Sequence, residues 1–240
     1  KVILTVGLFA PLDPILDWID YLSPSLNGRY GLRSTLAPRW KSFILGYADR
    51  NNRFPGSVSS GSEHVANQVA LAYQWIVPKL ERSKEKNLSP PISGEELFLL
   101  IAGIFLHDIG LTGPPRARGV SVKEFKRHGF VAAERVVELF KNRSKSSFAA
   151  AADLLPSFES LEEVELVSTI CAYHQRRTPI TEEVARKRKR RRSVRLGPSL
   201  EKALELRKYL LSFNGKDIDL FKTVSLLRLI DLCDCQCSRV

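Results

Sequence analysis

Histidine and aspartate side chains are the residues of this sequence whose types and spacing could do chemistry. The chain has four histidines in 240 residues. All four lie on or at the end of predicted helices, together with two aspartates. The set comprises His64, His107, Asp108, His128, His174 and Asp231. Divalent metals are bound by imidazole and carboxylate groups together. This pattern predicts a metal centre built from several helices.

Helical spacing places some of these residues beside the core. Ile170 precedes His174 by four positions, and Leu227 precedes Asp231 by four, so each pair shares a helix face. An aspartate that faces a core is costly unless it is paired, hydrogen-bonded or bound to a metal. A single histidine on an apolar face is more often a core residue than a ligand, and Asp108 could cap its helix. Because all four histidines occur together with two aspartates, the set favours a metal site over these separate structural roles.

Helices separated by Pro, Gly and Ser must position these residues. Capping-box spacing, a Ser followed three residues later by Glu, occurs at Ser93, Ser121 and Ser160. Asn214-Gly215 is expected to separate the last two helices. Because period-2 alternation is scarce, we expect an all-α fold with little or no sheet. The expected helices cover 13–22, 62–80, 94–108, 122–141, 161–174, 199–213 and 217–235.

The segment Phe105-Leu106-His107-Asp108-Ile109-Gly110 resembles the paired His-Asp signature of the HD phosphohydrolase superfamily. Members have an early His, the His-Asp pair, optional further histidines and a late Asp, and this chain has the same order. The segment that begins at His128-Gly129 and the Leu-Leu-Arg-Leu-Ile-Asp ending at Asp231 are also similar to the superfamily. The resemblance covers about residues 60–240 and implies an HD-domain helical bundle.

The resemblance also implies a ligand set for divalent metal, which could be Mn, Fe, Ni, Co, Zn or Mg. His64, His107, Asp108 and Asp231 match the ligands of the first ion. In members with two ions the aspartate that matches Asp108 bridges them, and His128 and His174 match the ligands of the second ion. We expect two ions because both extra histidines are present. One ion, with one or both of these histidines touching the scissile phosphate, is the alternative.

The implied activity is metal-dependent hydrolysis of a nucleotide or nucleic-acid phosphoester or phosphoanhydride, by a phosphodiesterase or a nuclease. Bound metal lowers the pKa of its water from 15.7 toward about 7. We expect Asp108, His128 and His174 to take part in catalysis. The alternative is a catalytically inactive regulatory HD module that binds a nucleotide or metal within a larger assembly. Leu111 replaces a Lys common in hydrolytic members, and His174-Gln175 replaces the paired histidines of cyclic-dinucleotide branches, so the substrate stays open.

The positive charge of the chain is concentrated in one segment. The net charge is +11, and an unbroken run of seven basic residues begins at Arg186 and ends at Arg192. This run lies in a predicted basic loop over 175–198. It is a solvated loop, a contact to a nucleic-acid backbone, or a nuclear-import or anionic-membrane contact. Residues 1–60 are predicted to form an N-terminal helical and loop extension, and 61–240 the HD-type domain.

Other features limit the setting of the protein. The sequence has no apolar stretch of the 18–20 residues that a membrane span requires. Cys233, Cys235 and Cys237 crowd into five positions, which favours a reducing, cytoplasmic setting over a disulfide framework. Methionine is absent even at position 1, so we expect either a fragment of a longer parent chain or an incomplete sequence. Asp234, one turn after Asp231, is expected to support a metal ligand or to cap the helix.

Overall fold

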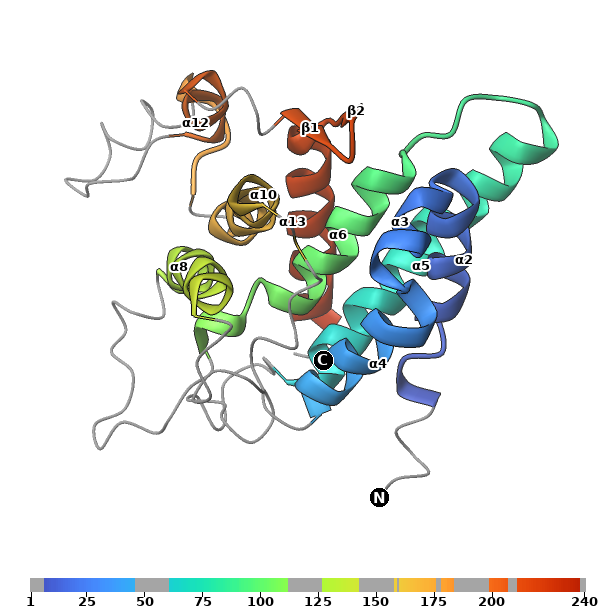
Figure 1. Cartoon of the computed structure of the whole chain (residues 1–240), viewed down its shortest axis with the longest axis horizontal. Helices are drawn as coiled ribbons and strands as arrows, with labels where there is room; N and C mark the ends of the chain where they lie inside the picture. The colour runs from blue at the N-terminus through green and yellow to red at the C-terminus, as the bar shows by residue number, and fades with distance from the viewer. Residues whose placement is uncertain are drawn as a thin grey trace.

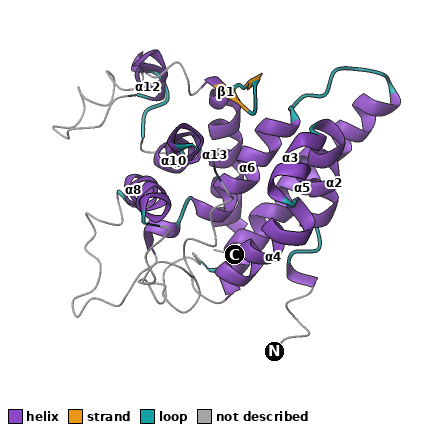
Figure 2. Cartoon of the chain, in the orientation of Figure 1, coloured by secondary structure: helices purple, strands orange, loops and turns teal. Residues whose placement is uncertain are grey.

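The structure is a computed structural model that describes residues 7–45, 61–111, 127–142, 158, 160–175, 178–183, 199–206 and 211–237. Within these residues the fold is all-α, with strands only in one short hairpin (Figure 2). The N-terminal elements are α2 (Leu12–Leu22), α3 (Pro24–Tyr30), the π-helix η1 (Leu32–Leu36) and α4 (Ala37–Phe43). They are followed by α5 (Ser62–Glu85), α6 (Gly94–Leu106), the 3-10 helix η3 (Ile109–Leu111), α8 (His128–Lys141), α10 (Leu161–Tyr173), α12 (Leu200–Leu206), β1 (Ser212–Phe213), β2 (Lys216–Asp217) and α13 (Leu220–Cys237).

Helix α6 is the centre of the bundle because every one of its residues is buried. It packs against α13, with α2 and α5 on one side and α10 on the other (Figure 1). Its first turn is closed by the expected capping box, in which Ser93 and Glu96 bond to each other's backbone N–H. A Cβ at Gly103 would lie 2.7 Å from the side chain of Ile170. The missing side chain therefore lets α10 come close to α6.

The N-terminal segment is more helical than the sequence analysis indicated, since only 13–22 was expected to form a helix there. Helices α3, η1 and α4 follow α2 within the described residues. Tertiary packing holds them: Trp40 is 1% exposed, and its ring stacks on that of Phe105 with centroids 4.9 Å apart. The ring of Phe9 also stacks on that of Phe105, with centroids 5.8 Å apart.

The expected helix over 199–213 is wrong at its end, because Ser212 and Phe213 form a strand instead. They pair antiparallel with Lys216 and Asp217. Asn214 and Gly215 have φ angles of 53° and 73°. Two successive positive φ angles are typical of a two-residue hairpin turn, which explains why the Asn-Gly pair ends the preceding element.

The remaining helices agree closely with expectation. α6 and α10 begin at the expected residues and end within two residues of the expected ends, while α5 begins at residue 62 as expected and continues past Leu80 to Glu85. The expected helix over 122–141 is described from residue 127 and contains α8. Residues 122–126 and the basic run of 186–192 lie outside the described residues. Of the helices described, none has the length and apolar character to cross a membrane.

Candidate metal centre

Five separate parts of the fold bring the six predicted residues together. His64 lies in the first turn of α5, His107 and Asp108 follow α6, and His128 begins α8. His174 follows α10, and Asp231 lies in α13. The C-terminal ends of α6 and α10 meet the N-terminal end of α8. They meet because α8 packs on α10 and on η3, which comes shortly after α6 in the chain. Helix ends therefore deliver most of these side chains to one place.

The first group surrounds His64 and His107, whose Nε2 atoms are 3.3 Å apart. Oδ1 of Asp231 lies 3.4 Å from Nε2 of His64 and 3.7 Å from that of His107. Oδ2 of Asp108 lies 3.6 Å and 3.4 Å from the same two nitrogens. His64, His107 and Asp231 form a group that could hold a metal ion. Such spacings suit donors that share one cation at about 2.0–2.2 Å.

The second group surrounds the other oxygen of Asp108. Its Oδ1 lies 3.1 Å from Nε2 of His128 and 3.9 Å from Nε2 of His174. The two Nε2 atoms are 3.1 Å apart. His107, Asp108 and His174 also form a group that could hold a metal ion. Asp108 thus directs one oxygen at each pair of histidines.

Hydrogen bonds behind three of the rings direct Nε2 toward the cluster. Nδ1 of His107 bonds the carbonyl of Ile104 at 3.0 Å, and Nδ1 of His174 bonds that of Cys171 at 2.6 Å. Carbonyls in the last turn of a helix have no partner within the helix, so they are available to such donors. Nδ1 of His64 instead bonds the carboxylate of Asp234. When Nδ1 carries the proton of a neutral imidazole, the Nε2 lone pair is free to bind a metal.

Two glycines allow the backbones around Asp108 to approach. A Cβ at Gly110 would lie 2.5 Å from the carbonyl oxygen of His128, and a Cβ at Gly129 would lie 2.8 Å from that of Cys171. Real Cβ atoms essentially never come that close. Arg228 adds a polar link, since its Nε donates to the carbonyl of Tyr173 at 2.6 Å. These contacts hold η3, α8, α10 and α13 in register at the cluster.

The electrostatics of the cluster favour a cation. Among the described residues, the ion pairs of Asp108, Asp231 and Asp234 are all with histidines. Burial raises the pKa of Asp108, but the charges of His107 and His128 hold it well below its ordinary value. Burial lowers the pKa of His64, but hydrogen bonds to Asp231 and Asp234 raise it to about 10. The proton on His64 balances the negative charge of the neighbouring aspartates. A bound metal would balance this charge instead of the proton.

Two further observations bear on the fit to a metal. Oδ1 of Asp108 is buried, and within the described part of the chain its close partner is the ion-paired Nε2 of His128 at 3.1 Å rather than a hydrogen-bond donor of the backbone. Burial and the charges of His107 and His128 lower the pKa of His174 to about 3, so its ring is neutral at pH 7. A neutral imidazole beside a buried carboxylate oxygen is the donor chemistry that divalent metals require. The residues therefore fit a metal.

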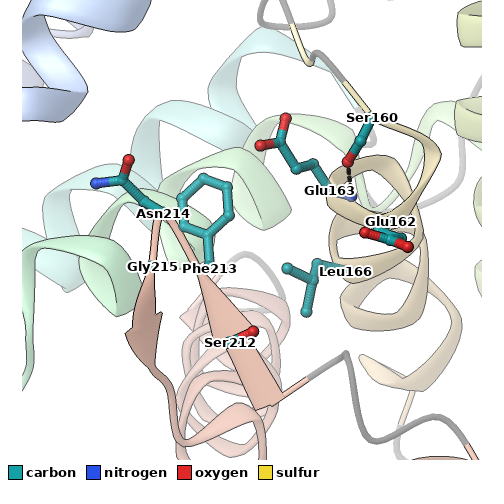
Figure 3. Close-up of a pocket in the computed structure, with 8 residues that line it drawn as sticks. All are labelled: Ser160, Glu162, Glu163, Leu166, Ser212, Phe213, Asn214 and Gly215. Carbon is teal, nitrogen blue, oxygen red and sulfur yellow. Dashed lines mark hydrogen bonds between the residues drawn. The ribbon is translucent and has the colours of Figure 1, made fainter.

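A pocket of about 180 Å³ lies elsewhere, between the start of α10 and the β1–β2 hairpin (Figure 3). Helix α10 has 13 residues and is about 20 Å long, and His174 follows its other end. None of the six predicted residues lines this pocket, so it is separate from the cluster. The lining residues are Ser160, Glu162, Glu163, Leu166, Ser212, Phe213, Asn214 and Gly215.

The comparison with known proteins agrees with this cluster. Residues 46–240 match the model of the HD-CE family, a stretch that includes all six residues and the helices that carry them. The chain belongs to the HD-CE family. No curated protein and no solved structure matches it. Membership of an HD-CE family, with a buried His/Asp cluster, is compatible with a metal-dependent hydrolase in general.

Sequence reasoning missed two polar residues of this HD-CE cluster. Gln68 bonds His64 and Asp231 through its side-chain amide. Nε2 of Gln175 lies 2.7 Å from Nδ1 of His128. The only signal for Gln68 is its place one helical turn after His64, and glutamine is common in helices for its propensity alone. Asp234 was expected either to support a ligand or to cap the helix, and it bonds His64.

Proposed function

We propose that this HD-CE protein is a metal-dependent phosphohydrolase that cleaves a phosphoester or phosphoanhydride of a nucleotide or nucleic acid. The observation that carries the proposal is the orientation of Asp108, whose Oδ2 faces His64 and His107 while its Oδ1 faces His128 and His174. One carboxylate placed between two histidine pairs suits a site with two cations.

In this proposal His64, His107, Asp108 and Asp231 hold one cation, and Asp108, His128 and His174 hold a second. Nitrogen and oxygen donors of this kind suit Mn, Fe, Co, Ni, Zn or Mg. Such ions supply a water of lowered pKa and polarise a phosphoryl oxygen. The protein contributes the fixed positions of the side chains, which the helix ends and the hydrogen bonds at Nδ1 provide.

Side-chain exposure indicates the direction from which a substrate approaches. The side chains of His64, His107 and His174 are 3%, 0% and 1% exposed. Those of Asp108 and His128 are each 15% exposed, and that of Asp231 is 25% exposed. The first three therefore form the base of the site and the last three its rim. A phosphate group arriving from solvent meets the rim.

In the alternative with a single cation, His128 is the histidine best placed to contact that phosphate. Its side chain is the most exposed of the four histidines, and its Nε2 is 3.1 Å from Oδ1 of Asp108. Asp108 can orient the ring, and the ring can stabilise charge on a phosphoryl oxygen in the transition state. His174 is neutral and buried, and so supports the site from its base.

We also propose that the run from Arg186 to Arg192 contacts the phosphate backbone of a nucleic acid.

The proposal is tested by a substrate screen with a matched inactive variant. Nucleotides, dinucleotides and single-stranded DNA and RNA would each be incubated with Mn²⁺, Ni²⁺, Co²⁺ or Mg²⁺, beside Asp108→Ala. We expect turnover in the wild type with at least one metal and none in the variant. Elemental analysis should find metal that Asp108→Ala loses. A wild type that takes up no metal contradicts the proposal, and one that binds a nucleotide tightly without turnover is a regulatory module.

A further inference from the structure

Gln68 is a buried amide that faces the first group of metal-binding residues. Its side chain lies in α5 one turn after His64, and the residue is 0% exposed. Its Nε2 is 2.9 Å from Nε2 of His64 and 3.0 Å from Oδ1 of Asp231. Its Oε1 is buried and has no hydrogen-bond partner among the residues that the structure describes. A buried amide oxygen without a partner is costly, so its place beside the cluster calls for one.

The position of the amide matches that of a neighbouring ligand in a metal's coordination sphere. When six ligands surround a cation octahedrally at about 2.1 Å, adjacent ligand atoms are about 3.0 Å apart. The amide head group of Gln68 lies 2.9 Å and 3.0 Å from the two ligand atoms, His64 Nε2 and Asp231 Oδ1. The amide therefore lies where a further ligand, adjacent to both of these atoms, would bind the cation.

A half-turn of the side-chain amide exchanges the positions of its oxygen and its nitrogen. The turn breaks no hydrogen bond at Oε1, because none of the described residues donates to it. A cation would use the lone pair of Asp231 Oδ1 that now accepts from Nε2, so this hydrogen bond is lost in any case. After the turn an oxygen, rather than an N–H group, faces the cation.

We propose that Gln68 is a further metal ligand, which binds the first cation through Oε1. The inference rests on the proposed metal centre. An amide oxygen is a neutral, hard donor that suits Mn²⁺ and Mg²⁺. As a ligand it takes a coordination position that water would otherwise fill. Fewer water positions then remain at the first cation, and the exchangeable water lies mainly at the second, beside the more exposed His128.

The competing role for Gln68 is to hold His64 and Asp231 together in the metal-free protein. In that role the amide N–H group competes with the cation for the lone pair of Asp231 Oδ1. Removing the amide would then strengthen metal binding, whereas removing a ligand would weaken it. The two roles therefore predict opposite changes in affinity.

The test compares Gln68→Ala and Gln68→Glu with Gln74→Ala, which removes an exposed glutamine from the same helix. Mn²⁺ affinity would be measured by titration, and the number of exchangeable waters on bound Mn²⁺ by water-proton relaxation. We expect Gln68→Ala to bind Mn²⁺ at least about tenfold more weakly, and because losing a partner outside the ligand set also weakens binding, the water count decides whether Gln68 is a ligand. Its bound Mn²⁺ should carry one more water. Gln68→Glu should bind at least as well as wild type, and Gln74→Ala should match it.

Equal or tighter Mn²⁺ binding by Gln68→Ala, with an unchanged water count, overturns the role of Gln68 alone. A wild type that binds no Mn²⁺ overturns this role and the proposed metal centre together. Melting temperatures of the metal-free proteins show whether each variant folds. If Gln68→Ala does not fold, Gln68→Glu decides, because weaker Mn²⁺ binding by this oxygen-bearing variant also contradicts ligation.

Discussion

Nδ1 of His64 and the carboxylate of Asp234 form a buried hydrogen bond that joins α5 to α13. Asp234 lies one turn after Asp231, so α13 carries both a candidate ligand and the group that orients another. A carboxylate behind a histidine fixes the tautomer and makes the metal-facing nitrogen more basic.

We therefore expect Asp234→Asn to weaken metal binding about 10- to 100-fold, the usual effect of losing such a partner. Metal titration monitored by calorimetry measures the loss. Asp217→Asn, which changes an exposed aspartate of β2, is the control and should bind like wild type. Unchanged affinity in Asp234→Asn would mean that the bond to His64 has no part in metal binding.

The second cation provides a prediction for His128 and His174. Replacing either by Ala should lower turnover at least about a hundredfold, the scale of losing one transition-state contact. Each variant should keep the first cation, because neither histidine belongs to the first group. Elemental analysis should therefore show one ion where the wild type has two. Turnover near that of the wild type in both variants would remove these residues from the mechanism.

The close backbone contacts at Gly110 and Gly129 predict a specific loss of stability. An added methyl group would force η3 away from α8, or α8 away from α10, at a cost of about 1–3 kcal/mol. Both changes should also reduce turnover, because they shift Asp108 relative to His128. Gly28→Ala is the control, since an added Cβ at residue 28 would meet nothing within 4 Å and Ala favours a helix. Urea unfolding distinguishes the variants, and equal stability of all three would contradict the contacts.

Glu95 predicts a pH dependence that is independent of the metal centre. Burial raises its pKa, but the hydroxyl of Ser23, which donates to Oε1 at 2.5 Å, and Lys216 at 3.0 Å lower it below its ordinary value of 4.5. A carboxyl whose folded pKa is lowered stabilises the fold above about pH 4.5, and this stability is lost as the pH falls through the folded pKa.

The corresponding variant is Glu95→Gln, compared with wild type by urea unfolding at pH 7 and at pH 3.5. The wild type should be the more stable at pH 7, and the difference should shrink at pH 3.5. Glu81→Gln, on the exposed surface of α5, should show no such trend. A difference that stays constant between the two pH values would show that the Glu95 charge does not contribute.

A nucleic-acid contact by the run from Arg186 to Arg192 predicts a steep salt dependence. For single strands, log affinity falls with log salt by about 0.7 per phosphate contacted. Replacing the run by Gly and Ser should reduce this slope by several units, while turnover of a small phosphodiester stays intact. Removing the exposed charges of Lys79 and Arg82 in α5 and of Lys86, which follows this helix, is the charge control. An unchanged slope would leave the run as a solvated loop.

Sequence patterns predicted most of the bundle because most of its signals are local. The Ser93 and Ser160 caps place the starts of α6 and α10, and the four-residue spacing between Leu227 and Asp231 places the aspartate beside the core. Helices α3 and α4 could not be found this way, because their stability comes from distant contacts such as that of Trp40 with Phe105. The strands of the hairpin have two residues each and are too short to show an alternation.

The candidate site was predictable as a set of residue types but not as a geometry. The order of histidines and aspartates indicated which residues could meet, and the structure brings all six together. No sequence pattern distinguishes the two oxygens of Asp108, or shows that Gln68 points at Asp231. Those relations depend on how the ends of helices from distant parts of the chain are packed.

The shared carboxylate of Asp108 has a thermodynamic consequence. In the proposed centre, an ion bound at one oxygen restricts the rotation of the carboxyl group and so presents the other oxygen in a fixed direction. The two positions are therefore coupled, and this orienting effect is opposed by the mutual repulsion of two cations that share one carboxylate. Because linkage between binding equilibria is reciprocal, the factor by which the first ion changes the affinity for the second applies equally in the other direction. Losing the second ion would then change the affinity of the first position without abolishing it.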